Sequence, residues 1–182
     1  MTSKTVMGVD TSTKGVAFCI VENGKPVKWG KVEFEGSKVF ERLADGQQRV
    51  KATFDDDLSK VDEIWFESAV FIQSKKTVVL LAMALGAIMS ALVTNGAAVN
   101  DVPAIAWQNF IGNKAFTKAE KAELKKQYPD RSDSWRSAKM RSMRKDKTKA
   151  WALETFGINV EDDDVSDAMA IAYYGWNKAN DS

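Results

Sequence analysis

The order of short β-rich segments and longer helical segments constrains the fold of this chain more than any other feature. Residues 16–21 and 26–34 flank Asn23-Gly24, the strongest short signal for a two-residue β-hairpin, and a short apolar segment at 6–10 precedes them. The segments that follow are a helical pattern at 39–54, a β-rich segment at 61–68, an apolar helical segment at 77–94, a β-like segment at 102–107 and helices at 117–127, 134–156 and 164–177. This order predicts one α/β domain over residues 1–182, with a mixed five-stranded sheet flanked by helices.

Composition excludes several classes of chemistry. The 182 residues include no histidine, which removes histidine zinc sites, Ser-His-Asp triads and histidine general bases. The single cysteine allows no internal disulfide and is typical of a reducing compartment. The polar N-terminus does not resemble a signal peptide. The apolar run 78–93 is short for a membrane span and follows Lys75-Lys76, so we expect a buried helix, a cytoplasmic location and no membrane partner.

Positive charge is concentrated in residues 114–149, which we call the basic arm. The arm holds 13 Lys or Arg against 5 Asp or Glu, although the whole chain has a net charge of only +1. A Thr117–Glu120 capping box opens its first helix. Such a charge distribution suits a protein that binds a polyanion, although a solvated helix face would look the same. The candidate DNA contacts on the arm are Lys139, Arg141, Arg144, Lys145 and Lys149.

Four carboxylates occupy positions that suit a metal site. Asp10 ends the first predicted strand, Glu67 ends the fourth, and Asp164 and Asp167 lie three residues apart at the start of the last helix. Strand ends and helix starts of an α/β sheet face the same crevice. Because clustered carboxylates repel one another, a hard divalent cation such as Mg²⁺ is the usual resolution. Two such ions can activate water at a phosphodiester.

Each carboxylate also has an ordinary structural interpretation. Asp164 can be a helix N-cap, and Asp167 can favour the helix dipole without any chemistry. Glu67 can simply end an edge strand, and Asp10 before Thr-Ser-Thr can form an Asx-type turn. The four together, beside a basic arm, favour the metal site.

Several motifs together resemble one nuclease family. They are GVDTSTKGVAFCIV at the start, FESAVF around Glu67, IAWQNFIGN, DKTKAWALETFGI and DDVSDAMAIAYY near the end. In the last, Asp164-Val-Ser-Asp167-Ala-Met-Ala fits an Asp-x-x-Asp-Ala-hydrophobic-Ala pattern position by position. Over nearly its whole length the chain thus resembles the RuvC-type Holliday junction resolvases of the retroviral-integrase/ribonuclease H-like superfamily.

The resemblance implies a ribonuclease H-like fold and a metal-dependent endonuclease that cuts four-way and other branched DNA as a homodimer. It implies that Asp10, Glu67, Asp164 and Asp167 bind two Mg²⁺ ions, with Mn²⁺ as a substitute, and that Lys147 lies near the scissile phosphate. It implies an aromatic wedge at Phe71, for which a core position is the alternative, and a cytoplasmic, nucleoid-associated protein of a bacterial or phage-infected cell.

The sequence also departs from the family. Thr11-Ser12-Thr13 replaces the usual Pro-Gly after the first aspartate, and no lysine lies near Trp107-Gln108-Asn109. The stretch at about 114–145 is longer than the usual connection, so we interpret it as a basic helical insertion in a single nuclease domain.

Three other functions remain open from the sequence. GVDTSTKG resembles the phosphate-binding start of sugar kinases and actin-like ATPases, but 182 residues cannot hold their two domains. A non-catalytic junction-binding module would use the arm alone. A ribonuclease H-like nuclease on RNA–DNA hybrids or flaps would share all four acids.

Overall fold

A mixed five-stranded sheet forms the centre of the molecule. The computed structural model describes residues 3–54, 57–68, 74–93 and 96–180. The strands are β1 (Val6–Thr11), β2 (Gly15–Glu22), β3 (Lys25–Glu33), β4 (Glu63–Glu67) and β5 (Ala98–Val102), in the sheet order β3-β2-β1-β4-β5. Strands β1 to β3 are antiparallel, while β4 and β5 run parallel to β1. The predicted α/β class and mixed five-stranded sheet are therefore confirmed.

The predicted hairpin is also confirmed. Glu22 pairs with Lys25, and both loop residues have positive φ, 50° at Asn23 and 74° at Gly24. Asn and Gly tolerate this left-handed conformation better than other residues, and its twist matches that of the flanking strands.

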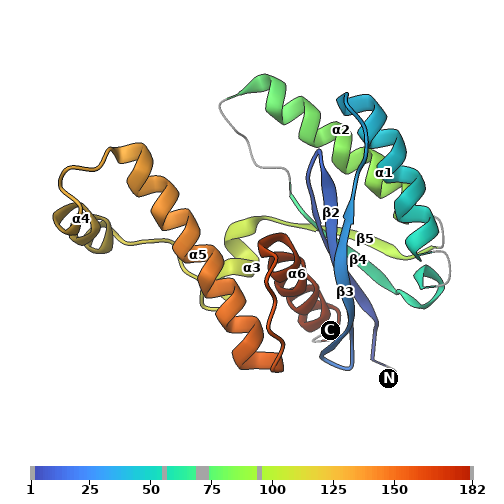
Figure 1. Ribbon diagram of the computed structural model, residues 1–182. Coiled ribbons are helices and arrows are strands. Elements are labelled where there is room, and N and C mark those ends of the chain that lie inside the picture. Colours follow the sequence, from blue (N-terminus) through green and yellow to red (C-terminus); the bar gives the residue numbers. More distant parts are fainter. Residues whose placement is uncertain (1–2, 55–56, 69–73, 94–95, 181–182) are drawn as a thin grey trace.

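Helices cover both faces of the sheet (Figure 1). One layer holds α1 (Val39–Phe54) and α2 (Lys75–Leu92), while α6 (Asp163–Asn180) packs across the other face. A short helical turn, η1 (Leu58–Lys60), precedes β4, and α3 (Ala104–Phe110) follows β5. The arm contains α4 (Lys118–Gln127) and the first half of α5 (Asp133–Phe156), and it projects from the body. The second half of α5 packs against α6.

Helix α6 lies unusually close to the central strand, at Gly8. A Cβ added to Gly8 would lie 2.4 Å from the carbonyl oxygen of Ala168 and 2.2 Å from the amide nitrogen of Ala172. Only glycine permits this approach, and the small buried residues Ala168 and Ala172 allow it from the helix side. This contact fixes the start of α6 relative to the end of β1.

Helix α2 is less buried than its composition predicts. Among its described residues only Ala84, Ile88, Ala91 and Leu92 are buried, and Val79 is 57% exposed. Among the described helices, α2 alone has the length and apolar composition of a membrane span, which is weak evidence because core helices pass the same test. Its contacts with α1 and β1 are those of a helix in a folded domain. The helix expected to be buried is therefore only partly buried in the monomer.

The strand expected at 102–107 is displaced. Strand β5 ends at Val102, Pro103 is the N-cap of α3, and the rest of the segment is helical. Proline suits the start of a helix because it has no N–H to leave unpaired and its φ, here −68°, is already helical. Trp107 is consequently a helix residue, and it is fully buried.

Candidate active site

The alternation of side chains along two neighbouring strands brings Asp10 and Glu67 to the same face. In β1, Met7 and Val9 point into the core beneath α1 and α2, so Gly8 and Asp10 point towards α6. In β4, Ile64 and Phe66 face the same core, so Glu67 points towards α6. Because Val9 pairs with Phe66 in parallel register, the two carboxylates end adjacent strands side by side.

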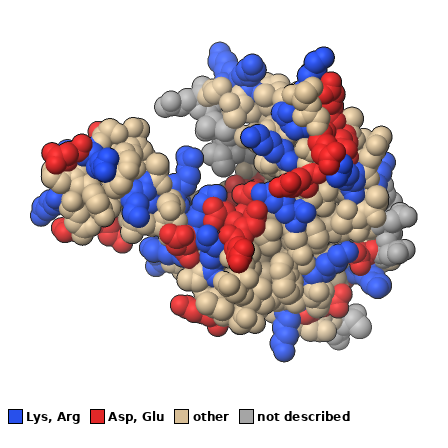
Figure 2. Space-filling model, in the orientation of Figure 1, with Lys and Arg blue, Asp and Glu red and all other residues tan. Residues whose placement is uncertain are grey.

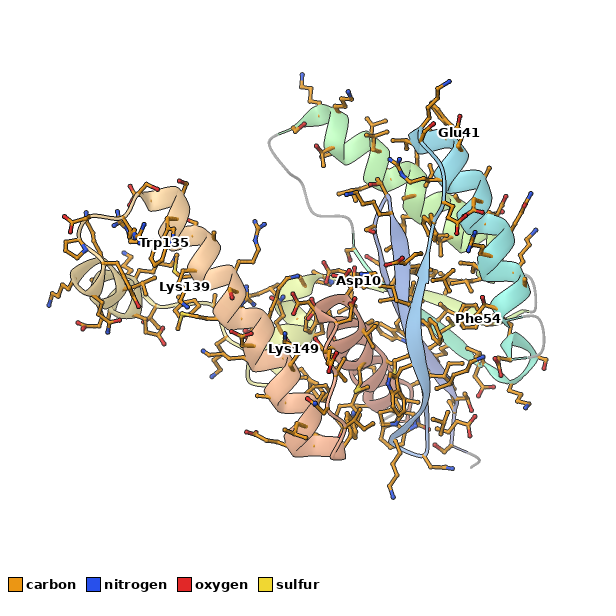
Figure 3. All side chains as sticks on the ribbon, in the orientation of Figure 1. Asp10, Glu41, Phe54, Trp135, Lys139 and Lys149 are labelled. Atoms are coloured by element: carbon orange, nitrogen blue, oxygen red, sulfur yellow. The ribbon has the colours of Figure 1, made fainter. Side chains whose placement is uncertain are left out.

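Asp10 lies in a strongly acidic environment. Burial, reinforced by the charges of Glu67, Asp167 and Asp164, raises the pKa of Asp10 to about 8. Lys145 is the one cation that opposes this shift. Figure 3 shows Asp10 at the end of the strands, close to the start of α6. The structure therefore brings the acids of β1, β4 and α6 within electrostatic reach of one another.

Glu67 is held by an indole. The Nε1–H of Trp107 donates to Oε2 of Glu67 over 3.0 Å. Burial raises the pKa of Glu67, and the hydrogen bond from Trp107 opposes this because it stabilises the ionised form. Helix α3 thus fixes the orientation of the carboxylate that ends β4.

Asp167 completes the cluster from the first turns of α6. Burial and the neighbouring Glu67 raise the pKa of Asp167 to about 7, while Lys145 and a hydrogen bond with Thr148 lower it. Lys145 and Thr148 both come from α5. Asp167 therefore lies between the two carboxylates of the sheet and the buried half of α5.

Asp164 differs from the other three carboxylates because it forms an ion pair with a lysine of the edge strand. Its Oδ2 accepts a 2.6 Å hydrogen bond from Nζ of Lys31, which reaches across from the edge strand β3. The N-cap interpretation of Asp164 is wrong, because Asp162 accepts hydrogen bonds from the amides of Asp164 and Val165. The Asx-turn interpretation of Asp10 is also wrong, because Ser12 makes that turn, accepting from the amides of Lys14 and Gly15.

The donor set fits a hard divalent cation, although the site is not preformed. Within the described ranges, no three acidic or cysteine side chains lie close enough together to form a ready-made metal site. Burial and the charge of Glu67 nevertheless raise the pKa of both Asp10 and Asp167, and Lys145 only partly compensates. Carboxylate oxygens are the ligands that Mg²⁺ prefers, and a divalent cation would stabilise these carboxylates in their ionised form.

The basic residues of the arm divide between those beside the carboxylate cluster and those on its projecting part. Lys145 and Lys149 both pair with Asp163, at 3.0 and 2.9 Å. The Arg144 guanidinium donates to Gln108, so a cation lies beside the 107–109 segment that lacks a lysine. Figure 2 shows acidic atoms at the centre of the visible face, with basic atoms beside them.

Three other predicted contacts fall elsewhere. Lys139 and Arg141 lie exposed on α5, where Figure 3 shows Lys139 on the projecting half. Lys147, which the resemblance places near the scissile phosphate, has its Nζ 5.1 Å from the centre of the Phe116 ring. It therefore lies against the segment between α3 and α4 and not among the clustered acids, and Lys145 is the lysine beside them. Phe71 lies outside the described residues.

Sequence reasoning missed Trp107, Lys31 and Thr148. The IAWQNF motif contained Trp107, but the segment was expected to be a strand and no role was given to its indole. Lys31 comes from an edge strand more than 130 residues from Asp164. No local sequence pattern predicts such a long-range contact. Thr148 lies within the DKTKAWALETFGI motif, but no role was given to it, and its burial is known only from the structure.

We expect Trp107→Phe to shift the pH dependence of any reaction that needs ionised Glu67 towards higher pH. The variant loses the N–H that lowers the pKa of Glu67, while burial, which raises it, remains. A pH–rate profile in saturating Mg²⁺ measures the shift. Trp151→Phe is the matched control, since Trp151 packs against Phe156 and Tyr173. An unchanged profile would remove Trp107 from the positioning of Glu67.

Fold and site together define the class. No family model and no curated protein matches the chain. The five-stranded mixed sheet with helices on both faces is the ribonuclease H-like fold. Solved structures with this fold include two of RuvC from Thermus thermophilus.

The RuvC described as being in complex with Holliday junction substrate has a TM-score of 0.67 and 14% identity, covering 96% of this chain and 94% of that chain. A second T. thermophilus RuvC structure has a TM-score of 0.65 and 14% identity, covering 96% and 95%. The predicted ribonuclease H-like fold is confirmed.

Proposed function

We propose that the protein is a divalent-metal-dependent endonuclease that cleaves phosphodiester bonds in four-way and other branched DNA. The observation that carries the proposal is the cluster of Asp10, Glu67 and Asp167, in which burial and the neighbouring carboxylates raise the pKa of Asp10 to about 8 and that of Asp167 to about 7. The RuvC fold and the adjacent basic arm support DNA as the substrate. Mg²⁺, with Mn²⁺ as a substitute and two ions in the site, is the proposed cofactor.

The residues of this chain have distinct tasks in that reaction. Asp10, Glu67 and Asp167 would hold the ions, whose chemistry is to activate water and stabilise the leaving oxygen. Trp107 and Thr148 orient two of these carboxylates. Lys145 brings positive charge to the carboxylate cluster, where the negative phosphodiester must approach. Asp164 would join the site by releasing Lys31, which frees a further ammonium group for the phosphate.

Cleavage of labelled substrates tests the proposal. A four-way junction, a flapped duplex, an RNA–DNA hybrid and a linear duplex of equal length are incubated with Mg²⁺, Mn²⁺ or EDTA. We expect metal-dependent nicks near the branch point of the junction and little cutting of the linear duplex. Preferential cutting of the hybrid would instead assign a ribonuclease H-like activity. No cutting of any substrate would leave a binding module.

We further propose that two copies act together through α2. Val79, Ala82, Met83 and Gly86 are spaced i, i+3, i+4 and i+7, so they form one stripe on that helix. Val79, Ala82 and Gly86 are exposed, and Met83 is partly so. An apolar stripe without cover on the monomer is typical of a helix that meets a partner. A two-fold axis would present paired sites to the two equivalent strands of a junction.

We expect Val79→Lys to convert a dimer into monomers without unfolding them. The lysine places charge in the apolar stripe, yet Val79 is exposed in the monomer, so its fold should persist. Sedimentation equilibrium at micromolar protein measures the mass, and circular dichroism confirms folding. Phe40→Lys on α1, where Phe40 is 68% exposed, is the matched control. A wild-type protein that sediments at 20 kDa with and without junction DNA would contradict the proposal. Leu85 and Met89 of the same helix are unsuitable positions for this test, because both pack against the core and a lysine there would destabilise the monomer.

A further inference from the structure

A cavity lies between the basic arm and the candidate active site. It has a volume of about 390 Å³ and is formed by α5, α4 and the segment that follows α3. Asp167 lines one end of it, so the cavity opens directly beside the carboxylate cluster. Its lining is strongly basic: the cations are Lys121, Arg141, Arg144 and Lys145, and Asp167 is the one carboxylate among the lining residues.

The cavity also contains an aromatic surface. The half-buried Phe116 and the thioether of Met140 line it. Cations next to an aromatic ring form the usual site for single-stranded nucleic acid, because the cations bind phosphate and the ring stacks on a base. A solvated cationic face, in contrast, needs neither a concave shape nor a ring.

Two residues that line the cavity each carry a buried polar atom without a hydrogen-bond partner. Asn113 is 3% exposed, and its Nδ2 donates to the Arg144 carbonyl and to Oγ1 of Thr148. Its Oδ1 has no hydrogen-bond partner among the described residues, and neither has Nε of Arg144. Because both atoms are themselves buried, they show that this wall holds unsatisfied polar groups, and the basic and aromatic lining is what selects the ligand.

We propose that this cavity binds one unpaired nucleotide of the DNA strand that leads to the carboxylates. The phosphate lies among Arg141, Lys121 and Lys145, and the base lies against Phe116 and Met140. The inference rests on the proposed function, since it assumes a DNA strand at Asp167. It adds a step that selects branched DNA over a continuous duplex. Branched DNA, in which a base can leave its stack at low cost, satisfies the cavity, whereas a continuous duplex does not.

Two variants of one helix test the proposal. Ser137 and Ser142 are both exposed on α5, but Ser137 lines the cavity and Ser142 does not. Ser137→Trp therefore fills the cavity, and Ser142→Trp makes the identical change outside it. Binding is measured in EDTA, without cleavage, for a four-way junction, a single-stranded oligonucleotide and a linear duplex. In the junction, 2-aminopurine replaces one base at a time around the branch point.

We expect Ser137→Trp to weaken binding to the junction and the single strand by about tenfold, the worth of one stacked base, with duplex affinity changed less than about twofold. We expect wild type and Ser142→Trp to raise 2-aminopurine fluorescence at one position, and Ser137→Trp to abolish this rise. The proposal would be overturned if Ser137→Trp kept the wild-type preference for the junction over the duplex and the wild-type rise in 2-aminopurine fluorescence. Because binding is read without metal, its outcome is independent of whether the wild type cleaves DNA, which the Mg²⁺ experiment above decides.

Discussion

Asp10→Asn is expected to lower metal-dependent cleavage of branched DNA by at least about 10³-fold, while DNA binding in EDTA stays the same or tightens. The amide is a poorer ligand than a carboxylate, and a loss of several kcal/mol of metal-derived stabilisation corresponds to this factor. Binding does not suffer, because the change removes a negative charge that repels phosphate. The same result is expected for Glu67→Gln and Asp167→Asn. Gel-based cleavage and fluorescence anisotropy measure the two quantities.

The same substitution has a second signature in stability. The pKa of Asp10 is raised from 3.8 to about 8, so the native state binds this proton more tightly than the unfolded state does. The free energy of unfolding therefore falls as pH rises between about 4 and 8. Asn stays neutral, so without metal the variant should have a higher Tm than wild type at pH 8 and above, and the two should converge near pH 4. Mg²⁺ at pH 8 should raise the Tm of wild type more than that of Asp10→Asn.

Asp130→Asn is the control for both measurements, because Asp130 is exposed in the turn between α4 and α5. Cleavage by Asp10→Asn at the wild-type rate would remove Asp10 from the mechanism. Equal Tm values at every pH would show that Asp10 is not held in a repulsive, buried cluster.

Neutralising Lys139 and Arg141 together is expected to reduce the salt dependence of DNA binding by about 1.8 in the slope of log K against log salt. Each lysine or arginine that contacts a phosphate releases counterions worth about 0.9 in this slope. Both side chains are exposed on α5, and no ion pair of either is present within the described ranges. Titration of a four-way junction in EDTA at several salt concentrations with Lys139→Gln/Arg141→Gln measures the slope.

Lys51→Gln/Lys60→Gln removes the same charge from α1 and η1, in the layer opposite α6. This control should keep the wild-type slope if the arm binds DNA. A slope that changes equally in both double variants would reflect net charge alone, and the arm would then be a solvated helix face.

The sequence was most informative where local pattern and position in the chain coincide. Asp10 and Glu67 were predictable because each ends an apolar strand, and adjacent parallel strands end at the same edge of a sheet. Asp167 was predictable from the helix that it opens. Lys31 and Trp107 were not, since a hydrogen bond between distant elements depends on how the helices and strands finally pack.

Helix geometry explains why Lys145, and not the predicted Lys147, lies beside the clustered acids. Two residues apart on a helix means about 200° around its axis, so only one of the two lysines can face the acids. The sequence of α5 is basic on several sides, and its charges alone do not determine which side turns towards α6. The buried Thr148 and Ala152 fix that rotation, and they turn Lys147 towards Phe116.

Helix α5 connects the projecting part of the arm rigidly to the candidate active site. It runs without interruption from Asp133 to Phe156 and contains neither glycine nor proline, so it has no built-in hinge. Its outer half forms the arm, while Lys145 and Thr148 lie further along the same rod beside Asp167. If the arm binds DNA as proposed, a force on its outer half would move Lys145 relative to the carboxylates. A strand bound at the wrong angle would then leave the ammonium of Lys145 misplaced before any bond is cut.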